Sequence, residues 1–343
     1  MKTKLQLAGL ALLLSTLFPQ LSTCFAQGSL TPPGAPTPMM KTLDQIEPRL
    51  DVTKLTGDAN NVFIISSSGS FFLSQNVTGV SNKNGIAILA NNVTLDLNGF
   101  AVSGVAGSRN GINLPLGETN VAVRNGFIAG WGLNGVNGFS DSDKNILVEK
   151  VASSGNGGSG IFNNGQGIIR DCNTQNNAAG GIILNSGGSI LSCTISGEGT
   201  YGILAELAQV RDCHVSYVNG YGIYSSGSSV INCYVEGCTK RGSYVNVPGS
   251  LIEGNNCFGN NSSGSTSDAG IYLNDSNNRI ENNHVFASGY AGIQVNTFYL
   301  NNVVIKNTVS GNGTNNFLGL TGNDFGPIST AATATSPWAN ISH

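Results

Sequence analysis

Short apolar runs recur along this chain at a nearly constant spacing. Four of them read Gly-Ile-Phe, Gly-Ile-Ile, Gly-Ile-Leu and Gly-Ile-Tyr, and they begin at Gly160, Gly181, Gly202 and Gly222. Runs this short, separated by Gly, Asn and Ser, are typical of β-strands rather than helices. A period near 20 residues indicates units that stack on their neighbours. The pattern therefore predicts a parallel β-helix.

One position in each repeat is occupied first by cysteine and later by asparagine. The cysteines recur every 20 or 21 residues: Cys172, Cys193, Cys213 and Cys233. In the last repeats the equivalent residues are Asn255, Asn283 and Asn307. Residues in register on neighbouring coils lie about 4.8 Å apart, whereas a disulfide prefers Cβ atoms about 3.8 Å apart. We therefore expect an inward stack of free thiols, followed by a stack of hydrogen-bonded asparagines.

Two further cysteines, Cys238 and Cys257, lie outside this stack. Disulfides form in exported proteins, so one bond between these two residues is an alternative to a pair of free thiols. The sequence leaves both states of the pair open.

Ten glycines mark the starts of regular coils: Gly85, Gly111, Gly135, Gly160, Gly181, Gly202, Gly222, Gly242, Gly270 and Gly292. They predict an all-β solenoid of about ten coils over residues 85–310, with about 20 to 28 residues in each coil. The two ends of a solenoid expose strand edges and core, so they need caps. We assign residues 40–84 to an N-terminal cap with a first irregular coil, and residues 311–343 to a C-terminal cap or tail. A leucine-rich repeat is excluded, because its Leu-x-x-Leu-x-Leu frame is absent and no coil has room for a helix.

The N-terminal segment is typical of a secretory signal peptide. Lys2 and Lys4 precede an apolar run at residues 5–18, and Ala26 provides the small residue that a signal peptidase requires. We therefore predict a signal peptide at residues 1–26. The apolar run is too short to span a bilayer.

Cleavage after this segment would leave a mature chain that begins at Gln27. Residues 27–39 are rich in Gly and Pro and are expected to form a linker. The predicted location is therefore secreted, either extracellular or periplasmic. A lipid anchor on Cys24 is the alternative.

Composition narrows the classes of partner. Charged residues make up 10% of the chain, and the formal net charge is −3. The predicted mature region has no basic cluster, which argues against nucleic acid and anionic lipid as partners. It also has no segment apolar enough for a membrane span.

The first strand of each coil places one row of side chains on the outer surface. The Ile or Val that follows nine of the ten repeat glycines must face the core, so the next residue points outward. This outward row reads Ala87, Asn113, Asn137, Phe162, Ile183, Leu204, Tyr224, Tyr244, Tyr272 and Gln294. It contains no Asp, Glu, Lys, Arg or His, so it supplies neither the carboxyl pair of a glycosidase nor a metal site. We identify no catalytic residue and no cofactor from this row.

The aromatic part of the row is the candidate binding site. Phe162, Tyr224, Tyr244 and Tyr272 belong to an outward apolar band, and such a band marks an interaction surface. Tyrosine has a flat apolar face and a hydroxyl that can stay wet, which suits a sugar chain that runs along the axis. Two alternatives remain open: the tail after Gly311 folds over the band, or three β-helices associate through it as a trimer.

Two other groups of charged residues are expected to be close in space. Asp141 and Asp143, with Glu118 one coil below, could hold a calcium ion with loop carbonyls; a solvated loop is the favoured interpretation, so no metal site is assigned. Glu149 and Arg170 fall at equivalent outward positions of adjacent coils and are expected to form a surface salt bridge.

Three segments carry a resemblance to a known group of proteins. They are residues 40–49 (Met-Lys-Thr-Leu-Asp-Gln-Ile-Glu-Pro-Arg), 93–100 (Val-Thr-Leu-Asp-Leu-Asn-Gly-Phe) and 336–340 (Ser-Pro-Trp-Ala-Asn). The predicted mature chain resembles secreted bacterial right-handed parallel β-helix repeat proteins of the pectin-lyase-like superfamily. The resemblance implies a right-handed coil and export, and it hints at polysaccharide chemistry. Polygalacturonase-like strings such as Asn-Thr-Asp and Gly-His-Gly are absent.

Three functional hypotheses follow. The first is an exported β-helix protein that binds polysaccharide or serves in the cell envelope without catalysis. The second is a polysaccharide lyase or glycoside hydrolase whose catalytic residues come from loops. The third is a structural or adhesive spacer. The absence of charge from the outward row favours the first and third hypotheses over the second.

Overall fold

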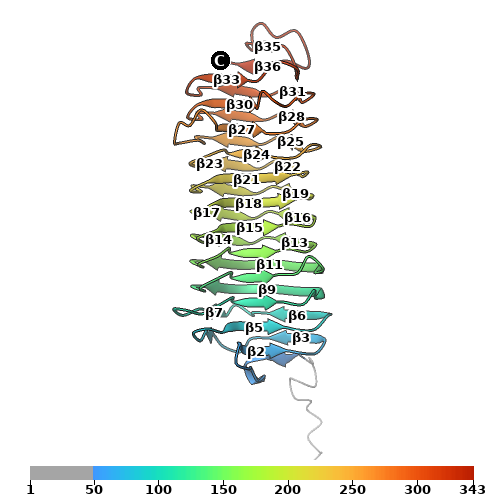
Figure 1. Ribbon diagram of the computed structural model, residues 1–343, viewed down its shortest axis with the longest axis vertical. Helices are drawn as coiled ribbons and strands as arrows, with labels where there is room; N and C mark the ends of the chain where they lie inside the picture. The colour runs from blue at the N-terminus through green and yellow to red at the C-terminus, as the bar shows by residue number, and fades with distance from the viewer. Residues whose placement is uncertain (1–48) are drawn as a thin grey trace, which may run out of the picture. The chain divides into compact units, whose positions relative to one another are not determined.

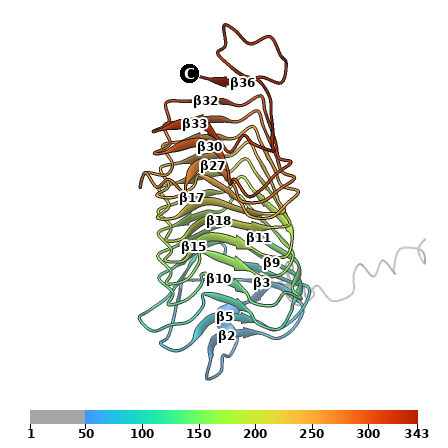
Figure 2. The ribbon, with the colours of Figure 1, turned by 45° about the horizontal axis from the view of Figure 1, so that its top comes forward.

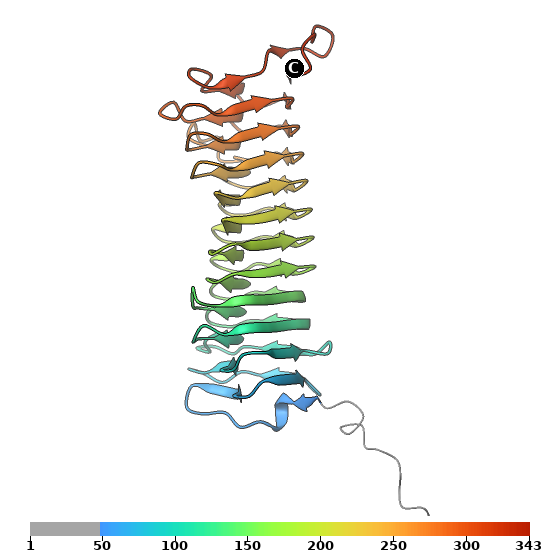
Figure 3. The same ribbon diagram turned by 90° about the vertical axis from the view of Figure 1, so that its right-hand side faces the viewer.

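A computed structural model describes residues 49–343 of the chain. The predicted signal peptide and linker, and the start of the predicted N-terminal cap, lie outside the described residues. Within residues 49–343 the chain winds into a parallel β-helix, whose coils stack strand upon strand (Figures 1 and 3). The one helical element in this part of the chain is a 3₁₀ turn, η2 (Val52–Lys54). No helix among these residues is long and apolar enough to cross a membrane.

The first sheet takes one strand from each coil. Its strands in order are β2 (Asn61–Ile65), β5 (Asn84–Ile88), β8 (Ile112–Leu114), β10 (Val136–Gly138), β12 (Ile161–Asn163), β15 (Gly180–Leu184), β18 (Tyr201–Glu206), β21 (Tyr221–Ser226), β24 (Ser243–Val245), β27 (Ala269–Leu273), β30 (Ala291–Val295) and β33 (Asn315–Leu318). This sheet has 12 strands, so the predicted count of about ten coils is too low. β2 lies in the segment assigned to the N-terminal cap and its irregular coil, and β33 lies in the segment assigned to the C-terminal cap or tail; neither strand begins with the repeat glycine.

The second sheet takes two strands from most coils, in two columns. The first column is β1 (Leu50–Asp51), β3 (Gly69–Phe72), β6 (Val93–Asp96), β9 (Thr119–Ala129), β11 (Lys144–Ser154), β13 (Gly167–Arg170), β16 (Gly188–Leu191), β19 (Ala208–Arg211), β22 (Ser229–Ile231), β25 (Leu251–Glu253), β28 (Arg279–Glu281), β31 (Val303–Ile305) and β34 (Asp324–Phe325). In Figure 2 these strands lie on a different side of the coil from the first sheet.

The second column follows the first after a bend. It consists of β4 (Val77–Thr78), β7 (Ala101–Ser103), β14 (Asn173–Gln175), β17 (Thr194–Ser196), β20 (His214–Ser216), β23 (Tyr234–Glu236), β26 (Asn256–Phe258), β29 (His284–Phe286), β32 (Thr308–Ser310), β36 (Asn340–Ser342) and β35 (Ile328–Ser329). The long strands β9 and β11 run through both columns. Every strand pair in both sheets is parallel.

In most coils the bend between the two columns uses one left-handed residue other than glycine. These residues have φ between 52° and 59°: Asn98, Asn125, Lys150, Asp171, Ser192, Asp212, Asn232, Asn282 and Lys306. Asn and Asp tolerate this conformation better than other side chains. The bend therefore accounts for part of the chain's richness in Asn.

The repeat glycine is required because two coils approach closely at its Cα. A Cβ added to Gly222 would lie 2.5 Å from the carbonyl oxygen of Gly242 on the next coil and 2.5 Å from Cγ1 of Val235 in the core. The following Ile223 is fully buried. Asn316 of β33 replaces the glycine in the last strand of this sheet, where no further coil follows.

The predicted cysteine and asparagine stacks are both present. All six cysteines of the described residues are buried free thiols, Cys238 and Cys257 included. The stacks join where the N–H of Cys233 donates to Oδ1 of Asn255 over 2.8 Å. The asparagine stack then continues through Asn283 and Asn307. It ends on Asn340, whose Oδ1 accepts from the N–H of Asn307 at 3.0 Å.

Because these thiols are buried, we expect a thiol reagent to titrate all of them only after the protein is unfolded. Burial raises the pKa of Cys238 and Cys257 to about 12, so neither forms the reactive thiolate at neutral pH. Titration of denatured, unreduced protein should find six thiols from the β-helix, whereas the native protein should react slowly. Two or fewer thiols in the denatured sample would contradict the free stack.

Candidate functional site

The outer face of the first sheet carries the predicted outward row in the predicted register. Phe162 pairs with Ile183, Tyr224 with Tyr244, and Tyr244 with Tyr272. The row continues to Gln294, which pairs with Leu318. All four candidate residues thus lie in one file.

A second outward file lies beside the first and was not predicted. It contains Tyr201, Tyr221 and Arg241, each directly before a repeat glycine; Tyr201 and Tyr221 pair across β18 and β21. Strict alternation would turn these residues inward. However, two consecutive positions face the core here, because a Cβ on Gly222 would point inward and Ile223 is buried. The alternation is thus shifted by one residue, and the residue before the glycine lies on the outer face. The sequence feature that could have predicted this second file is a large side chain directly before the repeat glycine in three successive coils.

The two files form a tyrosine cluster, defined as Tyr201, Tyr221, Tyr224, Tyr244 and Tyr272. The rings of Tyr201 and Tyr221 stack at 5.8 Å between centroids, and those of Tyr221 and Tyr244 stack at 5.4 Å. Tyr224 meets Tyr201 and Tyr244 edge to face, at 5.6 and 4.8 Å. Tyr272 lies 6.0 Å from Tyr244. These distances are those of favourable aromatic pairs, so the cluster holds its own rings in place.

Arg241 covers one end of the tyrosine cluster. Its guanidinium carbon lies 4.2 Å from the ring centroid of Tyr244 and 4.0 Å from that of Tyr272. The same guanidinium forms an ion pair with Asp268 at 2.9 Å. Tyr244 and Tyr272 are consequently only 9% and 6% exposed. The surface available to a ligand is therefore narrower than the predicted band, and it is centred on Tyr201, Tyr221 and Tyr224.

Burial also fixes the charge state of the tyrosines. Burial, with smaller contributions from the neighbouring tyrosines and Glu206, raises the pKa of Tyr224 to about 12. Burial raises the pKa of Tyr244 and Tyr272, although the charge of Arg241 opposes this effect. The hydroxyls of Tyr224, Tyr244 and Tyr272 are thus neutral hydrogen-bonding groups at physiological pH.

Amide side chains border the cluster on one side. The hydroxyl of Tyr244 donates to Oδ1 of Asn246 at 2.7 Å. Asn274 and Asn296 continue this border, each donating its amide to the preceding one, at 3.2 and 2.8 Å. The border therefore supplies polar groups beside an aromatic floor.

Phe162 lies in the same file but outside the cluster. Ile183 and Leu204 separate it from Tyr224. The structure thus aligns the four candidate residues but brings only the three tyrosines among them into one aromatic group.

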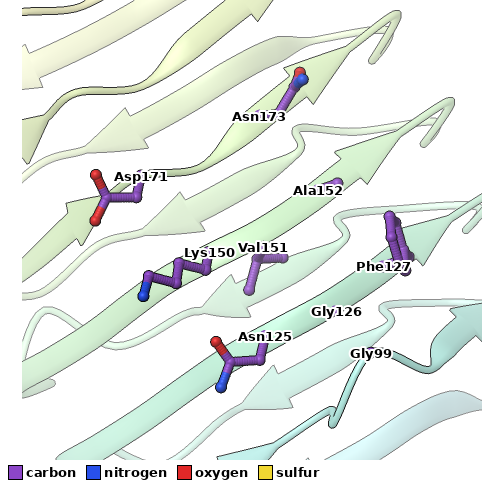
Figure 4. A pocket seen from close by; sticks show the side chains of 9 residues that line it. All are labelled: Gly99, Asn125, Gly126, Phe127, Lys150, Val151, Ala152, Asp171 and Asn173. Carbon is purple, nitrogen blue, oxygen red and sulfur yellow. The ribbon is translucent and has the colours of Figure 1, made fainter.

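A separate hollow of about 380 Å³ lies at the bend between the two columns of the second sheet (Figure 4). Asn125, Lys150 and Asp171 line it from successive coils, and Phe127 and Asn173 complete it. Phe127 is an exposed ring. No pattern in the sequence had singled out this group, because its members come from the bend residues of different coils.

The two groups of charged residues that were expected to be close in space are arranged differently in the structure. Arg170 and Glu149 form the predicted salt bridge, with Nη2 and Oε2 2.6 Å apart. Asp143 and Glu118 are buried, whereas Asp141 is exposed. Within residues 49–343, no group of three or more His, Cys, Asp or Glu side chains could hold a metal ion.

A family profile described as the right handed beta helix region matches residues 119–246 and 183–328. Together these matches cover more than half of the chain. The chain belongs to the right-handed β-helix family. No match was found among curated proteins.

The chain is also similar to solved structures. The A-module of the mannuronan C-5 epimerase AlgE6 of Azotobacter vinelandii is 16% identical, with a TM-score of 0.51 over 80% of this chain and 91% of that one. The AlgE4 A-module of the same organism is 14% identical, with a TM-score of 0.46 over the same shares. The periplasmic alginate epimerase AlgG is 12% identical, with a TM-score of 0.39 over 82% of this chain and 76% of that one. At such low identity the similarity to AlgE6 shows the fold alone.

On this right-handed β-helix the tyrosine cluster offers aromatic groups that can bind a ligand. Asp268 is the carboxylate that pairs with Arg241, and that pair is largely buried. The outward row itself holds no acidic or basic side chain other than tyrosine. A polymer on this face would meet aromatic rings, amides and neutral hydroxyls, with the charged side chains of Glu206 and Lys240 close to the rings.

Proposed function

We propose that this protein binds polysaccharide on the outer face of the first sheet and does so without catalysis. The observation that supports the proposal is the tyrosine cluster, with its amide border of Asn246, Asn274 and Asn296. Aromatic faces pack against the apolar faces of sugar rings, while amides and hydroxyls bind their hydroxyl groups. Export to the periplasm or the cell exterior belongs to the same proposal and is supported by Lys2, Lys4 and the apolar run that follows them.

The arrangement suits a chain that lies along the helix axis. Tyr201 and Tyr221 occupy the same position on successive coils, and adjacent coils are about 4.8 Å apart. Lys240 is exposed at the edge of the cluster, with its ammonium 5.0 Å from the ring centroid of Tyr221. It would give an acidic glycan one favourable charge beside the aromatic floor.

Glycan binding is expected to depend on the exposed tyrosines. We predict that Tyr221→Ala and Tyr224→Ala each weaken binding about tenfold, because each removes an aromatic contact worth about 1.4 kcal/mol. Calorimetric titration with mannuronan, a neutral glucan and a neutral mannan measures the affinity. Mannuronan is included because the name of the AlgE6 module contains it.

Tyr217→Ala is the matched control. Tyr217 is 67% exposed but follows β20 in the second sheet, away from the cluster. It should leave the affinity unchanged. Absence of glycan binding by the wild-type protein, or equal weakening by all three substitutions, would contradict the proposal.

Two further measurements separate the alternative functions. New ultraviolet absorbance from an unsaturated product, on incubation with a uronic-acid polymer, would favour a polysaccharide lyase. Sedimentation of wild-type and Tyr224→Ala proteins would detect association through the cluster. If the substitution changed only the mass of the assembly, the face would serve a trimer or an adhesive spacer instead.

A further inference from the structure

One inward row of the first sheet is interrupted by two polar or small residues. Leu114, Gly138, Asn163 and Leu184 are paired in register on successive strands β8, β10, β12 and β15. Both leucines are fully buried. Gly138 and Asn163 therefore replace two apolar core side chains, and polar atoms lie where a side chain of residue 138 would be.

Buried oxygen atoms without hydrogen-bond partners meet beside Gly138. Asp143 is 0% exposed, and neither of its carboxylate oxygens has a hydrogen-bond partner. Asn163 is 2% exposed, and its Oδ1 also lacks a partner. A Cβ added to Gly138 would lie 2.6 Å from Oδ1 of Asn163 and 3.0 Å from Oδ2 of Asp143. Unpaired buried polar atoms are costly, so the absence of partners for three oxygens requires an explanation.

The charge around these oxygens is negative. Glu118 is buried on the preceding coil, and its two carboxylate oxygens accept from the N–H of Leu116 at 3.2 and 3.1 Å. No Lys or Arg of residues 49–343 forms an ion pair with Asp143 or Glu118, and the neighbouring Lys144 is exposed.

The carboxyl of Asp143 responds to this surrounding charge. Burial and the charge of Glu118 raise the pKa of Asp143 to about 6, with a smaller contribution from Asp141. Backbone amides of Glu118 and Ser140 face the carboxylate and oppose this rise, but neither makes a hydrogen bond of good geometry with it. At neutral pH the buried charge lacks a positive partner.

We propose that Asp143, Asn163 and Glu118 bind a calcium ion beside Gly138. Carboxylate and amide oxygens are the ligands that hard cations prefer, and Ca²⁺ accepts six to eight of them in irregular geometry. Backbone carbonyls and water would complete its coordination. The ion would connect three successive coils at the bend that follows the first sheet. This inference is independent of glycan binding.

The proposal is tested by thermal unfolding in EDTA and in millimolar CaCl₂, without glycan. Calcium should raise the melting temperature of the wild-type protein by about 5 °C when its concentration is far above Kd. Asp143→Asn should remove this shift, and in EDTA it should melt no lower than wild type because the uncompensated charge is gone. Asp141→Asn, in the same loop but exposed, should keep the full shift.

Equilibrium dialysis against calcium gives the stoichiometry. The wild-type protein and Asp141→Asn should each bind one ion at this site, and Asp143→Asn should bind none there. The proposal is overturned if millimolar calcium neither binds nor shifts the melting temperature of the wild-type protein. It is also overturned if Asp141→Asn loses the ion as completely as Asp143→Asn, because the ion would then belong to the exposed loop.

Discussion

Asn283→Ala is expected to lower the free energy of unfolding by about 4 to 5 kcal/mol. Oδ1 of Asn283 accepts from the backbone N–H and the side-chain amide of Asn255, at 2.9 and 3.0 Å. Its own amide donates to the carbonyl of Ile252 at 2.9 Å and to Oδ1 of Asn307 at 3.0 Å. Alanine would leave several buried groups unpaired, at about 1 to 3 kcal/mol each. Chemical denaturation followed by circular dichroism measures the loss.

Asn274→Ala is the matched control for this prediction. Asn274 belongs to the same coil and also lies in a stack of amides, between Asn246 and Asn296. It is on the partly exposed outer face, where water can replace a lost partner, so the expected loss is below about 1 kcal/mol. Similar losses from both substitutions would show that burial is not what makes the inner stack important.

Glu198→Gln is expected to stabilise the protein at alkaline pH. Glu198 is fully buried and accepts from the backbone N–H of Asn177 at 2.6 Å and from its side-chain amide at 3.3 Å. Burial raises the pKa of Glu198 to about 7, against these hydrogen bonds, from an ordinary value of 4.5. The folded protein thus holds an extra proton between about pH 4.5 and 7, and stability falls as the pH rises through that range.

Glutamine keeps an acceptor for Asn177 but carries no charge. The variant should match wild type near pH 4.5 and exceed it at pH 8 by on the order of 2 to 3 kcal/mol. Denaturation curves at both pH values provide the comparison. Glu206→Gln, on the outer face of β18, controls for the loss of one negative charge. If Glu198→Gln raised the free energy of unfolding by the same amount at both pH values, the effect would not come from titration of a buried carboxyl.

The register of the coils could be predicted because the apolar residue after the repeat glycine is stable only in the core. An isoleucine such as Ile223 must be buried, and this requirement places Tyr224 on the outer face in file with Tyr244 and Tyr272. The same register brought Glu149 beside Arg170. The coil of β33 was not predicted because it lacks the repeat glycine that marked the ten regular coils, and for the same reason the coil of β2 was expected only as an irregular one.

Contacts made by turns could not be predicted in the same way. The position of Arg241 depends on a departure from strict alternation at the glycine that follows it, and its partner Asp268 comes from a loop. The convergence of Asp143 and Asn163 depends on the path of residues 139–143, which the period does not determine. The sequence predicted that Asp141 and Asp143 lie in one loop. It did not predict that Asp143 is buried and Asp141 is exposed.

The constant register of the coils has a consequence for how such a chain can change length during evolution. Gly181 and Gly202 are the repeat glycines of the adjacent strands β15 and β18, and Ile182 and Ile203 are paired. Loss of residues 182–202 would join Gly181 to Ile203 and recreate the Gly-Ile-Leu start of a strand. Duplication of the same segment would insert a coil whose two faces match its new neighbours. Unequal recombination can therefore lengthen or shorten the protein by whole coils, while the folding information in the remaining coils stays intact.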